Sequence, residues 1–167
     1  LYSEASFSQQ KDMMMFAVSY NMPGLAFRLA DLHLKNTGEA VNSALYPQPE
    51  THIKFDIDPA IIYGIIRKES SFYPLARSRV RATGLMQIMP ATAAFISNDR
   101  RFVSTNRHLL NNPDINLKLG QDYIFHLLNT PVVDQHLFKL LAAYNAGPGN
   151  LNKWIKKIDY RGDSFLL

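Results

Sequence analysis

Residues 58–72 read DPAIIYGIIRKESSF and contain a clear helix start. Asp58 can cap a helix, and Pro59 suits the first helical position, where the backbone needs no N–H donor. Four isoleucines between positions 61 and 66 then recur at helical spacing and form one apolar face. The segment therefore predicts a helix that begins at Pro59 and packs this face into a core.

One acidic residue, Glu69, lies on the same face as the isoleucines. It follows Ile65 by four positions and Ile62 by seven, which places all three on one side of a helix. Desolvation there would raise the pKa of the carboxyl group, and the helix C-terminus acts in the same direction. The alternative is that Glu69 ends the helix and turns into solvent. The next acidic residue is Asp99, so Glu69 has no carboxylate partner nearby in the sequence.

The bulk composition predicts one domain of ordinary size. The chain has 167 residues, of which 47% are hydrophobic, and this is enough to bury a substantial core. The net charge of +4 is mildly basic and suits an acidic polymer or surface. Basic residues are dispersed, and no run of Lys or Arg exceeds two, so we predict no nucleic-acid partner.

Several other classes of site are absent from the sequence. There is no cysteine, which excludes disulfides and thiolate metal sites. The five histidines have no HExxH-like spacing, and there is no GxGxxG, P-loop or GxSxG motif. We therefore predict neither a metal nor a cofactor. We also predict no transmembrane segment, because polar residues and Pro23 interrupt the apolar residues 13–30.

Helical periodicity and helix-breaking residues together predict an all-α fold, or nearly so. No convincing strand pair is found. Residues 1–50 are expected to form a helical hairpin and a linker, and residues 51–167 a second domain. The expected helices are 11–20, 25–34, 59–70, 90–96, 113–129, 134–144 and 150–158, with residues 36–55, 72–83 and 98–107 as linker or loops.

Three of these elements carry side chains that suit a sugar-binding groove. Glu69 offers a proton, Gln87 and Asn145 offer amide groups, and Tyr144 offers an aromatic face and a hydroxyl. Met86 or Met89 adds an adaptable apolar contact. Sugars need both apolar contacts and many directional hydrogen bonds. Spacing alone is equally consistent with Tyr144 as a core residue.

The same segments resemble the soluble lytic transglycosylases, whose catalytic domain is of the goose-type-lysozyme-like class. The resemblance covers about residues 56–158. It rests on three ordered motifs, which read RKESSF at 67–72, ATGLMQIMPATA at 82–93 and AAYNAGPG at 142–149, with NPDIN at 112–116 and GQDY at 120–123 between them.

This resemblance implies a lysozyme-like helical domain that acts on peptidoglycan. It makes Glu69 the single catalytic glutamate. It also implies that five other residues line the glycan groove or hold the glutamate: Ser78, Gln87, Met89, Tyr144 and Asn145. Residues 11–36 are similar to the helical linker region that precedes this domain in larger members, so residues 1–50 would be the end of an upstream helical region.

The resemblance also implies a place of action and a set of partners. A peptidoglycan enzyme of a bacterium is expected in the periplasm or cell envelope, with glycan strands as its partner. Cell-wall synthesis or secretion machinery would be further partners, which the sequence does not identify.

The chain departs from the family pattern at its end. Family members of this type usually continue beyond the Trp-containing helix into a segment with Pro-Phe and Glu-Thr-Arg, followed by a closing helix. Here the last residues read RGDSFLL at 161–167. The expectation is a catalytic domain, residues 51–167, without this closing segment, which would leave one wall of the groove incomplete.

The expected reaction is cleavage of the β-1,4 bond between N-acetylmuramic acid and N-acetylglucosamine, with formation of a 1,6-anhydro sugar. Two alternatives stay open at this point. One is a goose-type-lysozyme-like muramidase, which hydrolyses the same bond with water. The other is a module that binds peptidoglycan without cleaving it.

Overall fold

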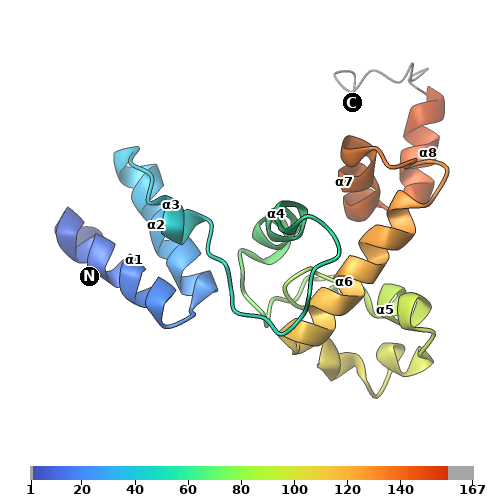
Figure 1. Ribbon diagram of the computed structural model, residues 1–167, viewed down its shortest axis with the longest axis horizontal. Helices are drawn as coiled ribbons and strands as arrows, with labels where there is room; N and C mark the ends of the chain where they lie inside the picture. Colours follow the sequence, from blue (N-terminus) through green and yellow to red (C-terminus); the bar gives the residue numbers. More distant parts are fainter. Residues whose placement is uncertain (1, 158–167) are drawn as a thin grey trace. The chain divides into compact units, whose positions relative to one another are not determined.

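The computed structural model describes residues 2–157, and its regular elements within that range are all helical (Figure 1). Only isolated β-bridges, Arg77–Thr83 and Thr83–Ile88, supplement the helices there. The predicted all-α class is therefore confirmed. The longer helices are α1 (Phe7–Ser19), α2 (Pro23–Thr37), α4 (Pro59–Ser70), α5 (Pro90–Ser97), α6 (Pro113–Leu128), α7 (Leu137–Ala146) and α8 (Pro148–Lys157).

The described residues also contain four short elements. They are α3 (Asn42–Leu45) and the 3₁₀ turns η1 (Tyr2–Glu4), η2 (Arg100–Val103) and η3 (Arg107–Asn111). The chain forms two compact units, residues 1–118 and 119–167, and the boundary falls inside α6. None of the described helices is both long and apolar enough to cross a membrane.

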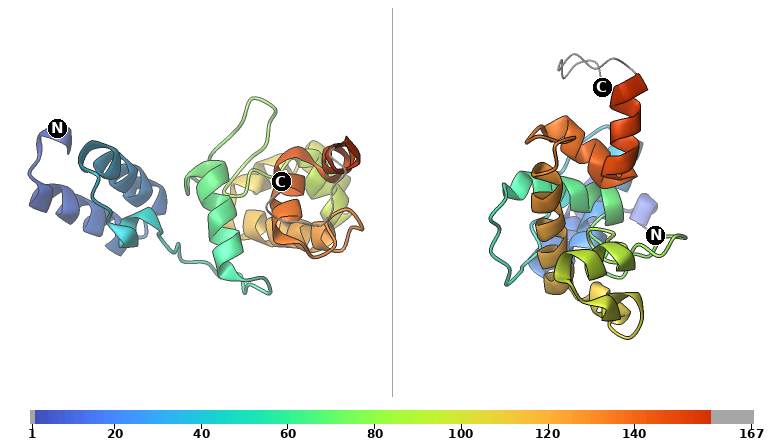
Figure 2. Two further views of the ribbon diagram at one scale, coloured as in Figure 1. Left: turned by 90° about the horizontal axis from the view of Figure 1, so that it is seen from above. Right: turned by 90° about the vertical axis from the view of Figure 1, so that its right-hand side faces the viewer.

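Helices α1 and α2 form the predicted helical hairpin, and α3 packs against both of them (Figures 1 and 2). Small side chains at the contact let the helix backbones approach closely. The alanines contribute little area each, so Met14 and Leu45 supply most of the apolar bulk. The buried residues of this cluster are Met14, Ala17, Ala26, Ala30, Ala44 and Leu45.

The predicted ends of the two hairpin helices were wrong. Helix α1 begins at Phe7, four residues before the predicted Lys11, because Ser6 and Gln9 form a capping box. The Gln9 N–H donates to the Ser6 hydroxyl oxygen at 3.3 Å, and the Ser6 N–H donates to Gln9 Oε1 at 2.9 Å. Helix α2 starts at Pro23 and continues to Thr37, where Gly38 ends it at φ 78°.

Helix α4 begins and packs as predicted. The Ala60 N–H donates to Asp58 Oδ1 at 2.8 Å, and Pro59 occupies the first turn. Ile62, Ile65 and Ile66 are buried. The helix ends at Ser70, since the following residue, Ser71, adopts the left-handed conformation at φ 51°.

Three predicted loop or helix boundaries need correction. The expected linker 36–55 contains the single turn α3, and the expected loop 98–107 contains η2 and the start of η3. Helix α7 begins at Leu137 instead of Asp134, because Asp134 and Gln135 have positive φ values of 49° and 58°. These single turns and left-handed residues leave no periodic pattern in the sequence.

In the second unit, α7 and α8 lie next to each other along the chain and in space. Gly147, at φ 84°, separates them and allows the sharp change of direction. Helix α8 begins at Pro148, two residues earlier than predicted, because proline fits its first turn. Residue 158 and the predicted departure from the family pattern at 161–167 lie outside the described residues.

Candidate active site

Glu69 is the penultimate residue of α4 and is only partly exposed. Burial raises the pKa of its carboxyl group above the ordinary value, and the neighbouring Lys68 charge opposes this by lowering it. Within residues 2–157, no hydrogen bond or ion pair holds the Glu69 carboxyl group. The result is an acid that keeps its proton to a higher pH than a solvated glutamate.

The segment after α4 folds into a set of tight turns held by backbone hydrogen bonds. Thr83 pairs with both Arg77 and Ile88 through the two β-bridges. Gly84 lies in the middle of this arrangement at φ 85°, and its N–H donates to the Ala76 carbonyl at 2.9 Å. A Cβ atom at position 84 would clash with the side-chain amide of Asn116 and with the Leu110 carbonyl oxygen. Only glycine fits this position.

Asn116 of α6 holds these turns from the inside. Its side chain is fully buried, at 0% exposure. The Met86 N–H donates to Asn116 Oδ1 at 2.8 Å. Asn116 Nδ2 donates to the carbonyl oxygens of Thr83 at 2.8 Å and Leu110 at 2.9 Å. One amide thus satisfies three buried backbone groups and fixes the turn that precedes Gln87.

The side-chain amide nitrogen of Gln87 has a structural role. It adopts the left-handed conformation at φ 49°, and its Nε2 donates to the carbonyl oxygens of Ala76 at 3.0 Å and Gly84 at 2.9 Å. Both amide hydrogens are therefore used inside the protein. The amide oxygen remains as the group that could accept a hydrogen bond from a ligand.

Ser78 and Met89 lie on the same system of turns. The Ala82 N–H donates to the Ser78 hydroxyl oxygen at 3.0 Å, so the hydroxyl hydrogen is left to donate elsewhere. Met89 immediately precedes α5 and is 37% exposed, so its thioether is accessible to a ligand. The structure thus brings Ser78, Gln87 and Met89 onto one folded segment of the unit that contains Glu69.

Tyr144 and Asn145 belong to the second unit. They stand in the last turn of α7, which ends at Ala146 before Gly147. The Tyr144 ring packs near Tyr123 of α6, with 5.5 Å between ring centroids and an angle of 52°. Asn145 is exposed. That these two residues meet Glu69 in one groove stays a prediction.

Sequence reasoning missed the role of Asn116. In the sequence, Asn116 stands out only as the last residue of the family-like motif NPDIN at 112–116. The signal that could have found it is its position: Asn116 precedes Leu117 and lies four residues before Gly120, on the buried side of α6. A polar residue buried in this way needs partners, and irregular backbone is a common source of them.

The chemistry available in the first unit is that of a single acid. Among the described residues there is no group of three or more His, Cys, Asp or Glu that could hold a metal ion. Glu69 is a carboxylic acid with a raised pKa, and the turns of the same unit carry the Ser78 hydroxyl, the Gln87 amide oxygen and the exposed Met89 thioether. Such a set suits proton transfer to a polar, partly apolar ligand.

Comparison with known families agrees with this chemistry. The family model described as the transglycosylase SLT domain matches residues 49–164. The chain belongs to this family. The match includes Glu69 and all five residues expected to line the groove, and it confirms the resemblance seen in the sequence motifs.

Individual relatives of the chain are named lytic murein transglycosylases. The chain is 35% identical over 105 residues to a soluble lytic murein transglycosylase of Salmonella typhimurium, which covers 60% of this chain and 15% of the relative. It is 33% identical over 109 residues to a membrane-bound lytic murein transglycosylase C of Photorhabdus laumondii, which covers 61% of this chain and 30% of the relative. The chain therefore spans less than a third of the length of these curated relatives.

A solved structure agrees with the fold of the chain. The lytic transglycosylase Slt of Pseudomonas aeruginosa superposes with a TM-score of 0.68 and 28% identity. The superposition covers 96% of this chain and 26% of that one, and the solved protein is an inactive variant in which a glutamate is replaced by glutamine. The lysozyme-like helical architecture and the helical segment before it are thus shared.

Proposed function

We propose that this chain is the catalytic part of a peptidoglycan lytic transglycosylase and that Glu69 is its single catalytic acid and base. The observation that carries this proposal is Glu69 itself, a partly buried carboxyl group with a raised pKa at the end of α4. Family membership over residues 49–164 supports the substrate class. Residues 51–167 would be the catalytic domain, and residues 1–50 the end of a helical region.

The proposed reaction begins with protonated Glu69, which donates its proton to the glycosidic oxygen between N-acetylmuramic acid and N-acetylglucosamine. The 2-acetamido group of the substrate stabilises C1, so a second carboxylate is not required. Glu69, now ionised, accepts the proton of the C6 hydroxyl as that oxygen bonds to C1. The product is a 1,6-anhydro sugar, and no water is consumed.

A raised pKa serves both halves of this reaction. A group that acts first as acid and then as base works best when its pKa lies near the working pH. Ser78, the Gln87 amide oxygen and Met89 would contact the glycan from one segment, and Tyr144 and Asn145 from the end of α7. The relatives that are named murein transglycosylases support a bacterial cell envelope, including the periplasm, as the place of action.

Product analysis tests the proposal directly. Purified peptidoglycan is digested with the protein, and the soluble fragments are separated and weighed by mass spectrometry. Fragments ending in anhydromuramic acid, each lighter by one water than a hydrolysis product, are expected. Reducing muramic acid ends without anhydro species would instead identify a goose-type-lysozyme-like muramidase.

The variant Glu69→Gln separates an enzyme from a binding module. We expect product formation to fall by about 10²–10⁴-fold or more, while sedimentation with insoluble peptidoglycan is retained. A Glu69→Gln protein that behaves like the wild type in both assays would identify a non-catalytic module. The conservative variant Lys68→Arg, which keeps the neighbouring positive charge that acts on the Glu69 pKa, is the matched control and should retain most activity.

A further inference from the structure

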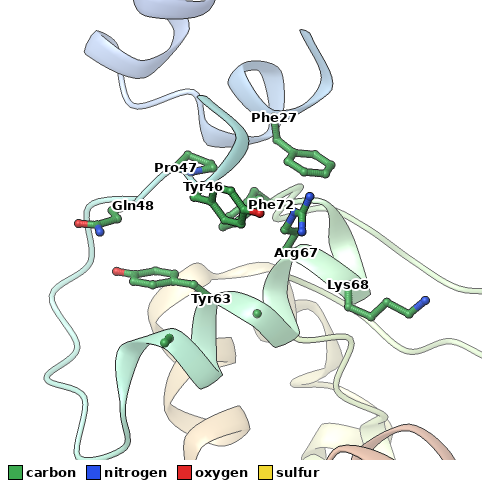
Figure 3. A pocket seen from close by; sticks show the side chains of 10 residues that line it. Phe27, Tyr46, Pro47, Gln48, Tyr63, Arg67, Lys68 and Phe72 are labelled. Atoms are coloured by element: carbon green, nitrogen blue, oxygen red, sulfur yellow. The ribbon is translucent and has the colours of Figure 1, made fainter. Parts of the chain in front are cut away.

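A cavity of about 570 Å³ lies in the first unit, on a face of α4 that does not carry Glu69. Its lining residues on α4 follow helical spacing, and other walls come from α2 and from the extended segment 46–48 (Figure 3). This volume is typical of a small-ligand site. The α4 residues are Ala60, Tyr63, Gly64, Arg67 and Lys68, which stand on one side of the helix.

The cavity wall carries positive charge without a counter-charge. Arg67 and Lys68 line it, and no acidic residue does. Within the described residues, the Arg67 guanidinium makes no hydrogen bond or ion pair, and its buried Nε has no partner. An unsatisfied buried donor is unfavourable because it has lost its hydrogen bonds to water. An anionic group bound beside Arg67 would offset this charge.

Aromatic rings hold the guanidinium in place. The Arg67 Cζ atom lies 4.8 Å from the ring centroid of Tyr46 and 5.3 Å from that of Phe27. Figure 3 shows Arg67 reaching from α4 toward these two rings, while Tyr63 extends from the same helix in another direction. The rings orient the guanidinium plane without using its hydrogen-bond donors. The N–H groups of the Arg67 guanidinium are therefore held in position and make no hydrogen bond within the described residues.

Gly64 leaves one side of the cavity open. It stands in the middle of α4, where glycine stabilises a helix less than alanine does. A Cβ atom built at this position would meet nothing within 4 Å. Packing therefore does not require glycine here, whereas an open cavity does benefit from a residue without a side chain.

We propose that this cavity binds a short peptide that ends in a free carboxylate and carries small apolar side chains. The carboxylate would pair with the Arg67 guanidinium and with Lys68 at the edge. Methyl-sized side chains would pack against the rings of Tyr46, Tyr63 and Phe72, and the side-chain amide of Gln48 matches a peptide group. Two sources share this chemistry: peptides of the cell wall, which contain D-alanine, and peptides made of L-amino acids.

The test measures binding of N-acetyl-D-Ala-D-Ala and N-acetyl-L-Ala-L-Ala to the whole chain by calorimetry. The corresponding D-Ala-D-Ala amide, which lacks the carboxylate, is the ligand control. Saturable binding of at least one acid, weakened at least tenfold in the amide, is the expected result. Stronger binding of the D-form would identify wall peptides as the source, and stronger binding of the L-form ordinary peptides.

Two variants at one position check where the peptide binds. Gly64→Leu places a side chain in the cavity and should weaken binding of the acid at least tenfold. Gly64→Ala, the matched control, should change it less than threefold. A Gly64→Leu protein that binds as well as the wild type, an amide that binds as well as the acid, or no saturable binding of either acid would overturn the proposal.

The variant Arg67→Gln is an independent test of the same site. It should weaken binding of the peptide acid but not binding of the peptide amide. Circular dichroism of each variant confirms that it is folded before binding is measured. Peptidoglycan cleavage by Gly64→Leu is recorded in parallel. Loss of peptide binding with cleavage unchanged separates this site from the proposed catalytic function, and each proposal can then fail independently.

Discussion

At the scale of single residues, the environment of Glu69 decides what its carboxyl group can do. An acid whose pKa is raised in the folded state stabilises the fold at low pH relative to high pH. This contribution is fully present below the pKa of the unfolded chain, and it is lost as pH rises through the folded-state pKa. Glu69 therefore makes the protein less stable at neutral pH than the same fold with a neutral side chain there.

Replacing Glu69 with glutamine should remove this pH dependence. We expect Glu69→Gln to raise the melting temperature at pH 7 relative to the wild type, with a smaller difference at pH 4, where the wild-type acid holds its proton. Thermal unfolding followed by circular dichroism at both pH values measures the effect. A melting difference that is larger at pH 4 than at pH 7 would contradict the raised pKa.

Gly84 is the residue whose backbone the site depends on most. Its φ of 85° and the crowding by Asn116 and Leu110 leave no room for a side chain. We expect Gly84→Ala to lower the free energy of unfolding by roughly 2–5 kcal/mol and to reduce activity with it. Urea unfolding measures this change.

The matched control for that substitution is Gly64→Ala. Gly64 is helical and has open space around a new Cβ, so alanine there should stabilise the protein by about 0.5–1 kcal/mol. If both alanine variants changed stability alike, the crowding at position 84 would not be the cause of the loss.

At the scale of elements, α4 carries both the proposed catalytic residue, Glu69, and residues that line the cavity. Its start is held by the Asp58 cap and Pro59, and its last turn presents Glu69. The buried isoleucine face fixes how the helix is rotated, and this rotation decides that Glu69 is partly buried. The same rotation turns Gly64 and Arg67 to the cavity on another side of the helix.

Loss of the α4 cap should therefore affect stability before chemistry. Asp58→Ala leaves the Ala60 N–H without its acceptor and should cost about 0.5–2 kcal/mol. Differential scanning calorimetry should show a lower melting temperature, and Asp58→Ser, which keeps a capping oxygen, should recover most of it. Equal losses in both variants would show that the cap bond is not what stabilises the helix start.

At the scale of the whole molecule, the net charge of +4 favours an acidic polymer. Peptidoglycan carries carboxylates, and the attraction between them and a basic protein is screened by salt. The screening length falls from about 10 Å at 0.1 M salt to about 3 Å at 1 M. Long-range charge should therefore contribute to substrate binding at low salt and not at high salt.

A sedimentation assay with insoluble peptidoglycan checks this. We expect several-fold weaker binding at roughly 0.5 M salt than at roughly 0.05 M, because both partners are screened over this range. Chitin, an uncharged glycan, serves as the comparison polymer and should show little salt dependence. Binding to peptidoglycan that does not change with salt would mean that local contacts alone hold the substrate.

The sequence by itself determined the helical class, the start of α4 and the place of Glu69 on the isoleucine face near the end of that helix. Caps, prolines and the spacing of the isoleucines are local signals, and the interactions they report involve residues a few positions apart. It also predicts a groove with Gln87 and Met89 from their side-chain chemistry and with Ser78 from resemblance, and that groove stays a prediction. The ends of α1 and α2 were missed because a capping box and one left-handed glycine decide them.

Only the tertiary structure decided how the turns before Gln87 are held and where a second cavity lies. Asn116 satisfies backbone groups of Thr83 and Met86, which lie 33 and 30 residues away in sequence, and no local pattern reveals such a bond. The stacking of Arg67 between Phe27 and Tyr46 likewise joins three separate segments. These contacts depend on how distant parts of the chain pack, whereas propensity and periodicity report only on neighbours.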